Sequence, residues 1–141
     1  LEIVQTGSVD DPEILAAALL HDTIEDTETT PAELEGQFGK QVCKYVLEVT
    51  DDKSLPKDER KKKQIEHAKK LSKGAALIKL GDKISNVTDV AEHPPATWDI
   101  IRRKAYLDWA ETVVKNCPNV NEKMENKFQE VLNDARRRVI G

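Results

Sequence analysis

The sequence has few of the features that mark disulfide-bonded, membrane-spanning or nucleic-acid-binding proteins. Its 141 residues include two cysteines, Cys43 and Cys117, which are far apart and in no metal-binding spacing. Two such thiols are typical of a reducing cytosol. No apolar run approaches the roughly 20 residues that a membrane-spanning helix needs. The formal net charge of -4 argues against broad affinity for nucleic acid or membranes. We therefore expect a cytoplasmic protein with neither kind of partner.

Aromatic residues are scarce too, at 4%, and no stretch alternates apolar and polar residues as a half-buried strand would. The core must come from Leu, Ala, Ile and Val, and with abundant Lys and Glu this composition favours helices. No repeat or low-complexity linker divides the chain. We expect one compact all-α domain over residues 1–141. Because the chain opens inside an apolar, helix-like fragment, we also expect that N-terminal helices are missing from it.

Capping residues, prolines and glycines predict where the helices begin and end. Pro12 follows two aspartates and begins a helix that we expect to end near His21. Thr30 with Glu33 three residues later has capping-box spacing and predicts a helix that ends at Phe38. The polar stretch 50–56 predicts a loop. Further helices are expected over 40–49, 58–71, 75–90 and 97–115, and after 119 towards 139.

Four polar side chains stand together at the expected end of the first of these helices. His21 and Asp22 continue its apolar stripe at helical spacing, and Glu25 and Asp26 follow closely. An isolated buried carboxylate costs several kcal/mol, and a divalent cation removes that cost by binding carboxylate and imidazole together. A hydrogen-bonded core histidine would explain His21 alone. Four such side chains within six residues favour a metal site.

The expected helix over 75–90 carries a second polar group. Asp82 and Asn86 lie one turn apart on a strip beside its apolar stripe. From this stretch alone, a metal ligand and an exposed ion pair with Lys79 or Lys83 explain Asp82 equally well.

Candidate anion-binding residues come from two further segments. Lys57 ends a proline-stiffened loop, and the charged run 60–63 after it covers all sides of a helix, so that at most one or two of its side chains can face a ligand. Trp98, Arg102 and Tyr106 have the spacing of one helix face. Core packing explains the two rings about equally well, but a buried guanidinium needs an anionic partner, which a phosphate would supply.

These stretches resemble a known family. The pair His21–Asp22 with the distant Asp82 resembles the signature of HD metal-dependent phosphohydrolases. The strings 21–27 (HDTIEDT) and 79–86 (KLGDKISN) resemble the hydrolase branch of the RelA/SpoT family, and in particular its small alarmone hydrolases. The segment 49–57 and the residues Trp98, Arg102 and Tyr106 extend the similarity over essentially the whole chain.

The resemblance implies a hydrolase of the stringent response, which removes the 3′-pyrophosphate from guanosine tetra- or pentaphosphate with the help of Mn²⁺. The family pattern places the metal ligands at His21, Asp22 and Asp82, and the residues that handle the attacking water at Glu25 and Asp26. It places substrate contacts at Lys57, Asn86, Arg102 and Tyr106. The family's first metal-binding histidine and a basic substrate-binding segment would precede Leu1.

The residue types suit this chemistry even when the family resemblance is set aside. Cleavage of a phosphate ester needs an activated water, charge neutralisation on the phosphoryl oxygens and a proton for the leaving oxygen. Two other functions stay open: removal of a phosphate from NADPH at the same metal site, with which related animal enzymes are associated, and a non-catalytic nucleotide-binding or regulatory module. The division of work between Glu25 and Asp26 and the oligomeric state stay open as well.

Overall fold

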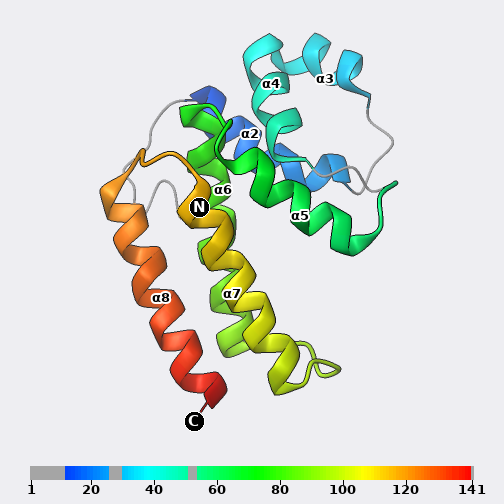
Figure 1. Cartoon of the computed structure of the whole chain (residues 1–141). Helices are drawn as coiled ribbons and strands as arrows, with labels where there is room; N and C mark the ends of the chain where they lie inside the picture. The colour runs from blue at the N-terminus through cyan, green and yellow to red at the C-terminus, as the bar shows by residue number, and fades with distance from the viewer. Residues whose placement is uncertain (1–11, 26–29, 51–53, 141) are drawn as a thin grey trace.

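The computed structural model describes residues 12–25, 30–50 and 54–140, and over these ranges it contains seven helices and no strand. This confirms the all-α prediction. The helices are α2 (Pro12–Glu25), α3 (Pro31–Phe38), α4 (Lys40–Val49), α5 (Lys57–Ala68), α6 (Lys73–Glu92), α7 (Ile100–Asn116) and α8 (Glu122–Ile140). Figure 1 shows α7 and α8 as long neighbouring helices, with α2, α3 and α4 gathered at the opposite end of the molecule.

Helix α6 is the central element of the fold. It packs against α2, α4, α7 and α8, so that almost every side of it is covered. The apolar stripe that the sequence predicts is buried, and two lysines, Lys79 and Lys83, are buried with it. The stripe residues Leu77, Leu80, Ile84 and Val87 join a core that α8 continues with Met124, Phe128, Leu132 and Ala135.

Helix α2 is one turn longer than the sequence predicts. It continues past His21 to Glu25, because neither glycine nor proline interrupts the backbone hydrogen bonding there. His21 and Asp22 are therefore helical residues near its C-terminal end. Helix α2 packs against both α4 and α6.

Side-chain caps set the starts of three other helices. Thr30 Oγ1 accepts a hydrogen bond from the Glu33 backbone N–H at 3.2 Å, which confirms the predicted cap. Ser72 caps α6 in the same way, so the helix begins at Lys73 rather than at residue 75. Asp99, not Thr97, caps α7, because its carboxylate accepts from the Arg102 backbone N–H at 2.8 Å.

Gly74 allows a close approach between α6 and α4. A Cβ atom at this position would lie 2.5 Å from two ring atoms of Tyr45, which comes from α4. The glycine therefore lies within α6 as a packing residue and not as a break between helices.

Two features complete the described part of the fold. The Arg136 guanidinium on α8 pairs with Glu111 at 3.0 Å and with Asp108 at 2.9 Å, which ties α8 to α7. None of the helices in the described ranges combines the length and the apolar character that crossing a bilayer requires.

Candidate functional site

Asp82 and Asn86 form the α6 part of the site. The Asn86 amide donates a hydrogen bond to Asp82 Oδ2 at 3.2 Å, and the ammonium of Lys83 lies 3.8 Å from the same oxygen. The Asp82 side chain is 27% exposed, whereas that of Lys83 is 4% exposed. The pair is therefore not the exposed ion pair that the sequence left open. A carboxylate has about four lone-pair sites, so Asp82 can accept from Asn86 and still bind a cation.

Three aromatic rings form a row beside these residues. The ring centroids of Trp98 and Tyr106 are 5.6 Å apart, and those of Tyr106 and Trp109 are 5.5 Å apart. Trp98 precedes α7 and is not on its surface, which corrects the expectation that Trp98, Arg102 and Tyr106 share one helix face. The three residues come together nonetheless, because the chain turns into α7 just after Trp98.

Four cations surround this row, and we call the rings and cations together the cation–aromatic cluster. The Arg102 guanidinium lies 4.5 Å from the centroid of the Trp98 ring, and the Lys57 ammonium lies 5.9 Å from it. The Lys61 ammonium is 5.2 Å from the centroid of the Trp109 ring, and that of Lys83 is 4.2 Å from it. Trp109 Nε1 also donates to the Lys61 carbonyl at 3.1 Å, which fixes α7 against α5.

Burial and neighbouring charges shift the pKa values of two cluster residues. The pKa of Lys61 is lowered by burial and by the positive charges of Lys57 and Arg102. The pKa of Tyr106 is raised, first by burial and then by the negative charge of Asp82. The four cations gathered on these rings attract an anionic ligand. Tyr106 stays protonated at neutral pH and can donate a hydrogen bond.

An open cleft of about 530 Å³ lies against the cluster. Asn86, Tyr106 and Trp98 contribute to its wall, together with Asp89 and His93. The structure therefore brings together the four predicted substrate-contacting residues: Asn86 and Tyr106 line the cleft, while Lys57 and Arg102 lie against the tryptophan that lines it.

The predicted metal-binding half of the site lies on α2. The structure describes the backbone of His21, Asp22 and Glu25, whereas their side chains and the whole of Asp26 lie outside its described part. The helix that carries them packs against α6, which carries Asp82. Among the side chains that are described, no three His, Cys, Asp or Glu residues could hold a metal ion together. The metal-ligand set stays a prediction.

Sequence reasoning missed two cations of the cluster, Lys61 and Lys83, and one residue of the cleft, Asp89. Lys61 belongs to the charged run 60–63, in which periodicity alone could not identify the residue that faces the rings. Lys83 was considered only as a partner of Asp82. Asp89 follows Asn86 at i+3 on the same strip of α6, and this spacing was the available signal for it.

Comparison with known proteins identifies the family to which the chain belongs. The family model of the HD domain matches residues 1–111. This chain belongs to the HD-domain family. The match confirms the resemblance seen in the sequence, and it includes every predicted site residue. HD-domain hydrolases are metal-dependent.

Within the HD-domain family, the chain is similar to the guanosine-3′,5′-bis(diphosphate) 3′-pyrophosphohydrolases called MESH1. It is 47% identical to the zebrafish (Danio rerio) protein over 126 residues, which cover 89% of this chain and 70% of the relative. It is 44% identical to the human protein over 130 residues, which cover 92% and 73%. A solved structure of a metazoan SpoT orthologue that hydrolyses ppGpp superposes with a TM-score of 0.89 at 44% identity, covering 94% of this chain and 74% of that one.

Proposed function

We propose that this HD-domain protein is a metal-dependent hydrolase that removes the 3′-pyrophosphate from guanosine tetra- or pentaphosphate. The products are GDP or GTP and pyrophosphate. The MESH1 relatives, at 43–47% identity, carry the name of this activity. The observation that carries the proposal is the open cleft lined by Asn86, Tyr106 and Trp98, with the cations Arg102 and Lys57 lying against its tryptophan. A nucleoside polyphosphate requires this combination of an amide, aromatic rings and positive charge.

The cation–aromatic cluster provides the substrate contacts. The rings of Trp98 and Tyr106 offer flat apolar surface to the nucleoside, and the phenolic hydroxyl can donate to a phosphoryl oxygen. Arg102 can bind a phosphoryl group through two parallel hydrogen bonds, while Lys57 adds a compact positive charge. Asn86 orients the Asp82 carboxylate through the 3.2 Å hydrogen bond.

We propose Mn²⁺ as the metal, held by His21, Asp22 and Asp82. This mixed imidazole and carboxylate set suits Mn²⁺, and the contact between α2 and α6 supports it because it joins the two helices that carry the ligands. Bound there, the ion would polarise a phosphoryl oxygen and lower the pKa of a coordinated water.

Glu25 and Asp26 are proposed to handle the protons. Together they position the attacking water and take its proton as its oxygen bonds to the phosphorus. The bond from that phosphorus to the ribose 3′-oxygen then breaks, and the same pair returns a proton to that oxygen. GDP and pyrophosphate leave.

We place this reaction in the cytoplasm. Cys43 is buried and Cys117 half-buried, and both are free thiols, which suits a reducing compartment. The oligomeric state is not part of the proposal.

Side-by-side turnover tests the proposed substrate. The protein, supplemented with Mn²⁺, is incubated with guanosine tetraphosphate or NADPH, and the products are separated by ion-exchange chromatography. We expect GDP and pyrophosphate from the first substrate, with a higher kcat/KM than for phosphate release from NADPH. Faster release from NADPH would replace the proposed substrate, and turnover of neither would favour a binding module.

The acid–base assignment has its own test. Glu25→Gln and Asp26→Asn should each keep the bound metal, as measured by elemental analysis, while lowering kcat by about 10²-fold or more. Parallel loss of metal and activity would instead identify these residues as ligands.

A further inference from the structure

We propose that a cavity between α4, α5 and α6 is a second site, which binds a small anion carrying phosphoryl groups. The cavity has a volume of about 340 Å³, and no described residue lines both it and the cleft beside Asp82. Its volume is within the roughly 300–1,000 Å³ range of small-molecule sites. The inference does not depend on the proposed function.

The lining of the cavity has a large excess of positive charge. Among the described residues that line it, four have cationic side chains, Arg60, Lys63, Lys70 and Lys79, and one, Glu48, has a carboxylate. That carboxylate already accepts two hydrogen bonds from Ser72, one from its backbone N–H at 2.9 Å and one from its hydroxyl at 2.7 Å. These neutral donors leave the carboxylate charged, but one carboxylate balances only one of the four cations, so the described lining stays positive.

Two of these cations have buried atoms and no ion-pair partner among the residues that the structure describes. Lys79 is 7% exposed, and no carboxylate in the described part of the chain forms an ion pair with it. The Arg60 Nε atom is buried and has no hydrogen-bond partner among the described residues. Burial of cations without compensation is unfavourable, and an anion in the cavity would relieve it for both side chains at once.

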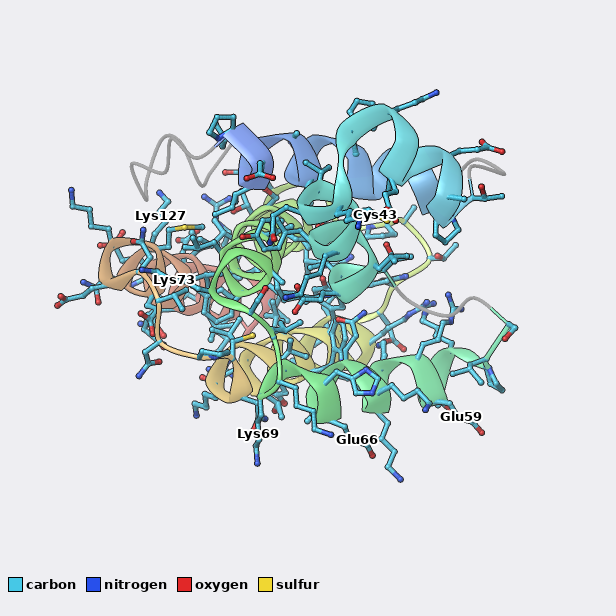
Figure 2. The ribbon with its side chains drawn as sticks, turned by 90° about the horizontal axis from the view of Figure 1, so that it is seen from above. Cys43, Glu59, Glu66, Lys69, Lys73 and Lys127 are labelled. Carbon is cyan, nitrogen blue, oxygen red and sulfur yellow. The ribbon has the colours of Figure 1, made fainter. Side chains whose placement is uncertain are left out.

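The surroundings strengthen this attraction. Apolar walls formed by Leu47, Leu55 and Leu71 lower the local dielectric constant, so that charge interactions are stronger there than in water. Acidic residues of α5 lie away from the cavity. Figure 2 shows the acidic Glu59 and Glu66 pointing away from the body of the domain, whereas Arg60 and Lys63 line the cavity.

A phosphoryl-bearing dianion or polyanion fits this lining better than a single carboxylate would. The arginine fork matches phosphoryl oxygens in a bidentate manner, and the additional lysines neutralise further negative charge. Inorganic pyrophosphate is therefore the probe, with orthophosphate and GDP in parallel to separate a need for two phosphoryl groups from a need for a nucleoside.

Isothermal titration calorimetry of the metal-free protein with pyrophosphate tests the site at constant ionic strength. Arg60→Gln should raise Kd by about tenfold or more, the usual effect of losing a charge-assisted hydrogen bond. Lys62→Gln is the matched control, because Lys62 is exposed on the same helix and does not line the cavity. Its Kd should stay within about twofold of the wild-type value.

Two further variants make every outcome decisive. Pyrophosphate is a product of the proposed reaction and can bind in the cleft as well, so Arg102→Ala is titrated too. Binding that Arg102→Ala abolishes and Arg60→Gln leaves unchanged would overturn the proposal, as would no binding at all. Lys79→Met, which removes the buried charge, should melt no earlier than wild type in phosphate-free buffer and should lose the rise in Tm with pyrophosphate. Early melting with a normal response to pyrophosphate would contradict the site.

Discussion

Replacement of Arg102 by alanine separates a substrate-binding role from a structural one. The side chain is exposed, its guanidinium lies 4.5 Å from the Trp98 ring centroid, and no carboxylate in the described ranges pairs with it. An exposed cation–π contact contributes only about 0.5–1 kcal/mol to stability. Charge-assisted hydrogen bonds to a phosphate contribute about 1.5–3 kcal/mol, equivalent to a factor of about 10–150 in kcat/KM. The effect on catalysis should therefore exceed the effect on stability.

The assay pairs hydrolysis of guanosine tetraphosphate with urea unfolding of the same preparations. Lys104→Ala is the matched control, because it removes an exposed positive charge from the same helix outside the cation–aromatic cluster. It should change kcat/KM by less than about twofold. Arg102→Lys keeps the charge without the planar fork, and its activity should fall between those of wild type and Arg102→Ala.

Two results would refute this reasoning. An Arg102→Ala protein that hydrolyses substrate normally but unfolds at lower urea concentration would make Arg102 a structural residue. A loss of equal size in Lys104→Ala would show that the general positive field, and not a direct contact, promotes binding.

Three further predictions follow from packing and charge. In urea unfolding, Gly74→Ala should lower the free energy of unfolding by about 1–3 kcal/mol, because its Cβ meets the Tyr45 ring at 2.5 Å. Gly36→Ala has open space around it and should raise the free energy of unfolding by up to about 1 kcal/mol. Equal effects of the two substitutions would contradict the close approach at Gly74. Arg136→Gln should cost about 0.5–1 kcal/mol at pH 7 for this partly exposed pair. The pairing lowers the pKa of Glu111 below its ordinary value of 4.5. The loss of stability in Arg136→Gln should therefore be present above pH 4.5 and vanish as the pH falls through the folded-state pKa of Glu111. A loss of stability that is independent of pH would exclude the pairing. Burial raises the pKa of Cys117 to about 11, so its alkylation by iodoacetamide at pH 8 should be about 100-fold slower than that of an ordinary thiol, with free glutathione as the reference.

Local signals in the sequence were sufficient for most of the secondary structure. Pro12 and Thr30 mark helix starts through interactions within one turn, and these starts are observed. The predicted start of α7 was wrong because Thr97 and Asp99 are both good capping residues and lie only two positions apart. Only the observed hydrogen bond from Arg102 to Asp99 distinguishes between them.

The structure describes the side chains of some predicted site residues and not of others. Helical periodicity was enough to put Asp82 and Asn86 on one strip of α6, and the structure shows the hydrogen bond between them. The roles of His21, Asp22 and Glu25 stay predictions, since their side chains lie outside the described part.

The sequence by itself determined which residues share a helix and which share a face of it, because both follow from 3.6-residue periodicity and from hydrogen bonds within a few residues. Only the tertiary structure decided which faces meet. Lys57 and Arg102 are far apart in sequence, yet both lie against Trp98, because α5 packs on α7. The same packing divides neighbouring cations of one run, so that Lys61 faces the rings and Arg60 faces the second cavity. Their separation depends on which helix covers each side of α5, and no local pattern contains that information.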